Sequence, residues 1–221
     1  MASMDVTRPK LVVILGACGS GKSVLLKHLV KTMFESGNLS WCRVYSKTHR
    51  ANHEYDWLPD GAVHDIDLEE IHEYQEKLLS AREERGGDKL PMNALIIDDS
   101  QGTIRNTYDK RLLTWYSLHR HTSTNIFMFL QFATSIPTAL RGMIDYVFVF
   151  ADTFFTSRRH VFNFIRQWYP KEKEFLAMFD QDTRKDHIYL MYTNRAETIE
   201  DSYLSFKAPH PKDFSAEFVV I

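Results

Sequence analysis

The sequence predicts an α/β fold in which a mostly parallel central sheet is flanked by helices. Apolar runs of five or six residues alternate with longer segments of helical periodicity, which is the rhythm of βαβ units. The runs are continuous in hydrophobicity, as expected of strands that helices cover on both faces. A glycine-rich loop also stands between the first run and the first helical segment, at residues 16–23.

The strands are assigned to the apolar runs and the helices to the periodic segments. Strands are expected at residues 11–15, 41–46, 94–97, 126–130, 146–150 and 188–192. Helices are expected at residues 22–34, 68–85, 109–119, 158–168 and 170–179. The first helix places four apolar side chains on one face: Leu26, Leu29, Val30 and Met33. Gly37 follows and ends this helix.

The chain is expected to form a single domain, because 221 residues can bury one substantial core. No linker rich in Pro, Gly or Ser divides it. Within that domain, a nucleotide-binding core is expected over residues 10–150 and a C-terminal extension over residues 151–221.

The composition limits how the protein can bind nucleic acid and indicates its cellular compartment. The formal net charge of -2 provides no overall positive field for nucleic acid, so such a contact has to be local. The two cysteines, Cys18 and Cys42, do not form a disulfide framework. The start, MASMDVTRPK, has no apolar signal core, and no run approaches the roughly 18 apolar residues of a membrane span. We expect a soluble protein of a reducing compartment.

The glycine-rich loop matches the phosphate-binding pattern G-x-x-x-x-G-K-[ST] after a strand and before a helix. Its backbone N–H groups and the helix N-terminus favour an anion. The residues expected to bind the nucleotide are Gly16, Ala17, Cys18, Gly19, Ser20, Gly21, Lys22, Ser23 and Val24. Lys22 would reach the β and γ phosphates, and the Ser23 hydroxyl would bind Mg²⁺. The alternative is a glycine-rich turn without a ligand, and Cys18 is interpreted as a small filler.

Two carboxylates end the apolar strand at residues 94–97. Asp98 is expected to hold Mg²⁺ through water, and Asp99 to polarise the attacking water. The other interpretation of Asp98 and Asp99 is a turn that caps the following helix.

Gln131 follows the buried strand at residues 126–130. In P-loop ATPases of the additional-strand type, a further strand lies between the two motif strands and ends in a polar residue that senses the γ phosphate. Because open α/β sheets bind ligands at the carboxyl ends of their strands, Gln131 would face Asp98 and the phosphate loop. A residue that caps the next turn is the alternative.

These segments resemble the genome-packaging ATPases of poxviruses and other large DNA viruses, within the FtsK/HerA superfamily of DNA pumps. The resemblance covers residues 10–150 and lies in the phosphate loop, residues 52–59, residues 95–99, Arg120-His121, Gln131 and residues 140–150. It implies an oligomeric ring, pentameric or hexameric, with ATP bound between neighbours and double-stranded DNA driven into a preformed capsid. It also implies a capsid or membrane-vertex partner and a place in the host cytoplasm at virion assembly sites, or in the virion.

Two features of the resemblance concern single residues. Asp99 stands where many relatives have Glu, which bears on the catalytic carboxylate. A ring pump also needs an arginine that reaches the neighbour's γ phosphate, and Arg120 and Arg141 are the candidates. Either one could instead be a surface arginine paired with a carboxylate.

Residues 157–173 form the densest basic stretch with interleaved aromatic residues. Arg158 and Arg159 could contact DNA phosphates without reading sequence. The alternative is a helix that buries its apolar side chains and leaves its charges in water: Val161, Phe162, Phe164, Ile165 and Trp168.

Three other functions remain open at this point. A P-loop alone also suits a small-molecule or nucleoside kinase. Residues 99–102 read D-x-x-G, as in GTPases, but no N-K-x-D sequence follows. A P-loop fold kept as a scaffold would leave Lys22 and Asp98 without a role.

Overall fold

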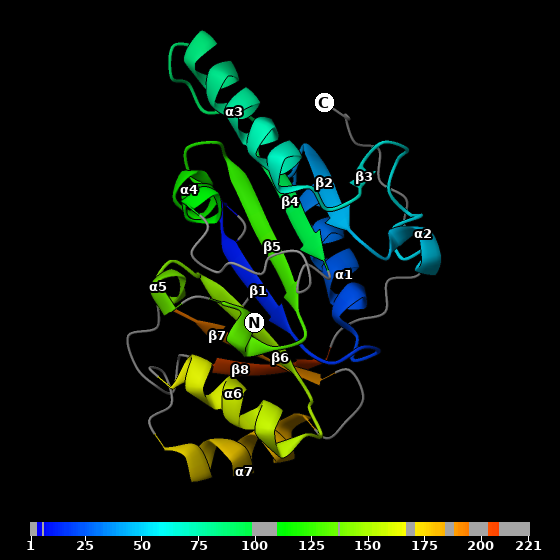
Figure 1. Cartoon of the computed structure of the whole chain (residues 1–221), viewed down its shortest axis with the longest axis vertical. Helices are drawn as coiled ribbons and strands as arrows, with labels where there is room; N and C mark the ends of the chain where they lie inside the picture. The colour runs from blue at the N-terminus through cyan, green and yellow to red at the C-terminus, as the bar shows by residue number, and fades with distance from the viewer. Residues whose placement is uncertain are drawn as a thin grey trace.

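The computed structural model describes residues 4–5, 7–98, 110–136, 138–166, 171–183, 188–194 and 203–207. Its centre is an eight-stranded sheet in the order β3-β2-β4-β5-β1-β6-β7-β8 (Figure 1). The first six strands in this order are parallel; β7 pairs antiparallel with β6 and with β8, so β7 alone runs in the opposite direction among these eight strands. The mostly parallel sheet predicted from the sequence is therefore confirmed.

The strands follow the apolar runs closely. They are β1 (Leu11–Leu15), β2 (Trp41–Ser46), β3 (Val63–His64), β4 (Asn93–Asp98), β5 (Thr124–Leu130), β6 (Tyr146–Phe150), β7 (Ile188–Thr193) and β8 (Tyr203–Lys207). All residues of β1, β5 and β6 are buried, which explains their continuous hydrophobicity. The sequence analysis did not predict the two-residue β3 or the final strand β8.

The helices differ from the prediction mainly at their ends. They are α1 (Lys22–Glu35), α2 (His49–Asn52), α3 (Leu68–Glu84), α4 (Lys110–Leu118), α5 (Thr138–Arg141), α6 (Phe155–Ile165) and α7 (Glu172–Thr183). The expected helix at 158–168 begins earlier, at Phe155, and the one at 170–179 continues to Thr183. Trp168 lies outside the described residues. The short helices α2 and α5 were not predicted, since four residues are too few for a periodic pattern.

The sheet has a hydrophobic core on each face, and β1 contributes to both. Leu11 and Val13 pack in the core that α4, α6 and α7 cover, whereas Val12 and Ile14 pack against α1. Figure 1 shows α6 and α7 side by side next to the β6–β8 end of the sheet. The predicted apolar face of α1 is buried as expected.

Strand β5 lies between β4 and β1 and pairs with both in parallel. This position is the one expected of an additional strand. Because the six strands are parallel, their carboxyl ends all lie along one side of the sheet and their amino ends along the opposite side. We call these two sides, which run across the strands, the carboxyl edge and the amino edge. Leu15 pairs with Leu130 at the carboxyl edge, and Leu11 pairs with Ile126 near the amino edge.

Candidate active site

The phosphate loop runs from the end of β1 to the start of α1, and its backbone adopts a conformation that depends on glycine. Gly19 and Gly21 have φ angles of 76° and 105°, in the left-handed region that side chains other than glycine rarely adopt. Gly21 is also the N-cap of α1. The Gly16 N–H donates to the Leu130 carbonyl at 3.2 Å, which ties the start of the loop to β5. The loop therefore curls at the helix N-terminus, where backbone amides favour an anion.

Lys22 folds back over the start of this loop. Its Nζ donates to the carbonyl oxygens of Gly16 and Ala17, at 2.6 and 2.7 Å. These two bonds hold the ammonium group beside the loop backbone. A mobile cation at this point can transfer its hydrogen bonds to phosphate oxygens.

An open crevice with a volume of about 520 Å³ lies above the loop at the carboxyl edge. The structure brings Lys22, Ser23, Asp98 and Gln131 together in this crevice. Its full lining is Cys18, Gly19, Gly21, Lys22, Ser23, Val24, Thr48, Ala51, Glu54, Asp98, Phe129, Leu130 and Gln131. Gly16, Ala17 and Ser20 belong to the loop but not to the lining. Gly16 is buried beneath the loop, packed close to Ser20 and Phe150.

Asp98 ends β4 and is held by a residue from another segment. The hydroxyl of Tyr55 donates to Asp98 Oδ2 at 2.7 Å, and Tyr55 itself is buried. A carboxylate and the hydroxyl of Ser23 therefore line the same crevice. Oxygen donors of this kind, few in number, suit Mg²⁺, which keeps most of its waters.

Gln131 is the first residue after β5, and its side chain is exposed at the crevice. The order of the sheet explains this placement, because β5 separates β1, which leads into the phosphate loop, from β4, which ends in Asp98. A strand at this position carries its last residue into the space between the other two. The juxtaposition expected from the sequence is present, and the role of Gln131 as a phosphate sensor stays a prediction.

Asp99, the candidate for activating water, lies outside the described residues, so its role stays a prediction. The structure instead adds a carboxylate that the sequence analysis missed. Glu54 is half-buried and lines the crevice, as do Thr48 and Ala51 from the same segment after β2. The rule that ligands bind at the carboxyl ends of parallel strands would have identified this segment, had it been applied to β2.

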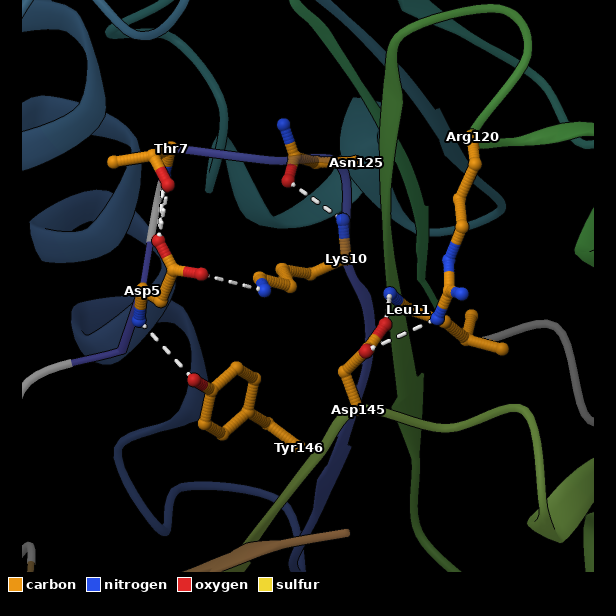
Figure 2. Close-up of polar contacts among 8 residues, drawn as sticks. All are labelled: Asp5, Thr7, Lys10, Leu11, Arg120, Asn125, Asp145 and Tyr146. Carbon is orange, nitrogen blue, oxygen red and sulfur yellow. Dashed lines mark hydrogen bonds and ion pairs between the residues drawn. The ribbon is translucent and has the colours of Figure 1, made fainter. Parts of the chain in front are cut away.

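The structure places Arg120, the first arginine candidate, before a strand that ends at the crevice but at the far end of that strand. Arg120 lies in the turn that leads into β5, hence at the amino edge, opposite the crevice. Its Nη2 donates to Oδ1 of Asp145 at 3.2 Å (Figure 2). Within one chain, Arg120 is therefore separated from the phosphate loop by the length of the sheet.

Arg141 also lies away from the crevice. It ends α5, its Nη1 donates to the Asn163 carbonyl at 3.1 Å, and its guanidinium lies 5.1 Å from the centre of the Phe164 ring. Burial lowers the pKa of Arg141, and the nearby charge of Arg166 adds to the shift. The side chain is thus engaged with α6 and does not line the crevice.

The basic stretch around α6 is mostly a packing surface. Arg158 is paired with Asp180, and Arg159 Nε contacts Glu172 Oε1 at 2.8 Å, both partners lying on α7. The apolar side chains expected to be buried are buried: Val161, Phe162, Phe164 and Ile165. The packed helix is therefore confirmed for these four residues, whereas Arg158 and Arg159 pair with α7 and are not simply left in water.

None of the described helices is long and apolar enough to cross a membrane.

The phosphate loop, the Asp98 strand and the interposed β5 define a class, that of P-loop ATPases with an additional strand. The family model described as Poxvirus A32 protein matches residues 6–193, and the chain belongs to this family. The resemblance to poxvirus packaging ATPases stated from the sequence is thereby confirmed.

Relatives and solved structures agree with this assignment. The uncharacterized protein 075L of Invertebrate iridescent virus 6 is 28% identical over 193 residues, covering 84% of this chain and 71% of that protein. The uncharacterized protein 015R of Frog virus 3 (isolate Goorha) is 26% identical over 216 residues, covering 97% of this chain and 66% of its own length. The chain thus spans about two thirds of the length of both relatives.

The fold is also similar to that of the genome packaging NTPase B204 from Sulfolobus turreted icosahedral virus 2, solved in complex with ATP-gammaS. The TM-score is 0.63 at 16% sequence identity, and the alignment covers 90% of this chain and 97% of B204. At this identity the likeness concerns the fold alone.

Proposed function

We propose that this protein is an ATP-driven DNA translocase that packages viral double-stranded DNA into a preformed capsid. The observation that carries the proposal is that Gln131, directly after the strand between β1 and β4, lines the same crevice as Lys22 and Asp98. This arrangement occurs here in a chain of the Poxvirus A32 protein family. A second structural neighbour, B204, the DNA-packaging ATPase from Sulfolobus turreted icosahedral virus, supports the same function.

Five residues have roles in this proposal. Lys22 neutralises charge on the β and γ phosphates, and Ser23 and Asp98 hold Mg²⁺, directly and through water. Asp99 polarises the attacking water, and Gln131 senses the γ phosphate. Bound Mg²⁺ would supply charge stabilisation to the phosphates.

The assembly belongs to the proposal as well. Subunits form a ring with ATP between neighbours, and an arginine of one subunit completes the crevice of the next. The other partners are double-stranded DNA and a capsid or membrane-vertex protein, at sites of virion assembly in the host cytoplasm or in the virion. Arg158 and Arg159 are weak candidates for DNA contact, since both are paired with α7.

A kinase for a small molecule or nucleoside is the alternative function. It would require an acceptor pocket beside the γ phosphate. Arg158 and Arg159, which could have belonged to an arginine-rich lid, instead lie on α6 and pair with α7. The polar end of β5 in the crevice favours hydrolysis over transfer to an acceptor.

The test is to measure ATP hydrolysis with Mg²⁺ and without any phosphate acceptor, in the presence and absence of duplex DNA. A translocase hydrolyses ATP alone and is stimulated by DNA, whereas a kinase is nearly inactive until its acceptor is supplied. Lys22→Ala should lower hydrolysis by roughly 10²–10³-fold, as does removal of a group that stabilises transition-state charge. Full activity of Lys22→Ala, or activity that depends on an acceptor, would refute the proposal.

A further inference from the structure

Asp145 stands at the amino edge, directly before β6, and binds two parts of the molecule. Its Oδ2 accepts a hydrogen bond from the Leu11 N–H at 3.0 Å, and its Oδ1 accepts one from Arg120 Nη2 at 3.2 Å (Figure 2). The backbone N–H of Asp145 also donates to the Leu11 carbonyl at 2.9 Å. The carboxylate is therefore anchored on β1 and aligned toward Arg120.

The two side chains of this ion pair differ sharply in burial. The Asp145 side chain is 3% exposed, whereas that of Arg120 is 54% exposed. A pair on the protein surface usually exposes both partners and contributes little to stability. Here a buried, fixed carboxylate holds one end of a guanidinium whose remainder faces outward. Such an arrangement orients Arg120 and leaves it accessible.

The backbone that carries Arg120 is also well fixed. In the turn between α4 and β5, the Thr124 N–H donates to the His119 carbonyl and the His121 N–H to the Leu118 carbonyl, each at 2.8 Å. The Thr122 hydroxyl lies 2.8 Å from that of Thr124. Both the main chain and the charged end of Arg120 are thus held in place.

Arg120 cannot serve the crevice of its own chain. The five residues of β1 that separate the two edges span roughly 15 Å, and the phosphate loop lies beyond them. Among the described residues that line the crevice, Lys22 is the only cation. A guanidinium for the γ phosphate therefore has to come from another molecule or from outside the described lining.

Exposed apolar side chains mark the same two edges. The large hydrophobic residues that are exposed in the described part of the chain are Phe132, Met143, Phe154 and Phe155. Phe132 follows Gln131 at the carboxyl edge, and Phe154 and Phe155 come soon after β6 ends there. Met143 lies two residues before Asp145, toward the amino edge. A head-to-tail contact, in which unlike surfaces of two copies meet, would cover both groups.

We propose that Asp145 is a positioning residue, which holds Arg120 ready to enter the crevice of a second copy of this chain. The inference rests on the proposed ring ATPase and deepens it, because it selects Arg120 over Arg141. Arg141 is held by α6, whereas Arg120 is oriented outward. It also specifies the contact: the amino edge of one subunit meets the carboxyl edge of the next.

The kinetic test compares Asp145→Asn with Arg120→Ala. Asparagine keeps an oxygen for the Leu11 N–H but removes the charge that holds Arg120. Each variant should lower kcat for ATP at least tenfold with little change in KM, because Arg120 acts on charge that develops in the transition state. In an Arg120→Ala background, Asp145→Asn should cost nothing further in kcat, since the carboxylate acts through the missing guanidinium.

The matched control is Asp5→Asn. Asp5 forms the neighbouring ion pair of the same edge, with Lys10 Nζ at 2.9 Å, but its carboxylate contacts no arginine in the described structure (Figure 2). This variant should keep the kcat of the unmodified protein. A loss of kcat equal to that of Asp145→Asn would show that any damage to the amino edge suffices, and would overturn the proposal.

Mixed rings provide the decisive measurement. A Lys22→Ala subunit cannot hydrolyse ATP but carries an intact Arg120, whereas an Asp145→Asn subunit has an intact crevice. Mixing the two should restore hydrolysis above that of either alone, as should mixing Lys22→Ala with Arg120→Ala. A merely structural defect in Asp145→Asn would not be rescued in this way.

Two outcomes overturn the inference while the proposed function stands. One is wild-type kcat in Asp145→Asn, and the other is lost activity that mixing does not restore. If Asp145→Asn does not fold, Asp145→Glu replaces it. Its longer side chain displaces the buried carboxylate and with it the guanidinium, so kcat should again fall and mixing with Lys22→Ala should restore it; wild-type kcat, or a loss that mixing does not restore, overturns the inference. Absence of ATP hydrolysis by the unmodified protein would instead remove the proposed function, and the inference with it.

Discussion

The hydroxyl of Tyr55 donates a 2.7 Å hydrogen bond to Oδ2 of Asp98. The two residues are 43 positions apart in the chain, and Tyr55 is buried where the segment after β2 folds over the end of β4. The bond fixes one oxygen of the carboxylate that is proposed to hold Mg²⁺. The segment after β2 thus contributes to the metal side of the crevice, in addition to lining it through Thr48, Ala51 and Glu54.

Tyr55→Phe should weaken the use of Mg²⁺ without unfolding the protein. The ring remains to fill its buried site, but the hydrogen bond to a charged group is lost, at a cost of about 1.5 kcal/mol. The Mg²⁺ concentration for half-maximal ATP hydrolysis should then rise roughly tenfold. Tyr116→Phe is the control, since its buried hydroxyl contacts Met128 Sδ and neither residue lines the crevice. Equal Mg²⁺ dependence in both variants would contradict the role of Tyr55.

Gly16→Ala should abolish nucleotide binding. A Cβ at residue 16 would lie 2.6 Å from Ser20 Oγ and 2.9 Å from Phe150 Cβ, closer than atoms pack. The loop would have to shift, and its backbone amides would lose their common direction. Binding of a fluorescent ATP analogue measures this loss. Gly142→Ala is the matched control, because a Cβ there meets nothing within 4 Å. Unchanged affinity in Gly16→Ala would refute the close packing of the loop.

Cys18 should react with thiol reagents, and ATP should protect it. Cys18 is exposed and lines the crevice, so a bound nucleotide would cover it. Cys42 serves as an internal control, because burial raises the pKa of its thiol to about 12 and keeps it protonated at neutral pH. Mass spectrometry after brief alkylation should find the label on Cys18 alone, and less of it with ATP and Mg²⁺. Labelling that ATP does not reduce would place the nucleotide elsewhere.

Asp5 should make stability depend on pH in acid. Hydrogen bonds from the Thr7 side chain, then from the buried Lys10, hold the pKa of Asp5 well below its ordinary value of 3.8. A lowered pKa in the folded state stabilises the protein above that ordinary value, and the stabilisation is lost as pH falls toward the folded-state pKa. The stability that the unmodified protein has over Asp5→Asn should therefore shrink below about pH 4. Urea unfolding from pH 2.5 to 6 tests this, and a constant difference would contradict it.

The phosphate loop could be predicted because its signal is local. Eight consecutive residues, flanked by an apolar run and a helical period, suffice to place backbone amides around an anion. The same holds for the central strands, whose hydrophobic runs are set by burial on both faces of the sheet. The family resemblance added the position of β5, which the strand order confirms.

The partners of the candidate arginines depended on contacts between distant segments. Arg158 and Arg159 were candidates for DNA contact, but α7 folds beside α6 and pairs with them. Arg120 was a candidate for reaching the neighbour's γ phosphate, and only the structure shows that it precedes β5 at the amino edge and pairs with Asp145. In both cases the sequence identified the arginines but not the carboxylates that pair with them.

The sequence by itself determined the α/β class, the nucleotide-binding loop and the acidic end of β4, since each depends on residues that are neighbours in the chain. The tertiary structure decided that Tyr55 holds Asp98 and that Asp145 holds Arg120. These pairs are joined by the order and register of the strands, which arise from packing between segments far apart in the chain. Local spacing carries no information about that packing, so only the folded sheet could reveal them.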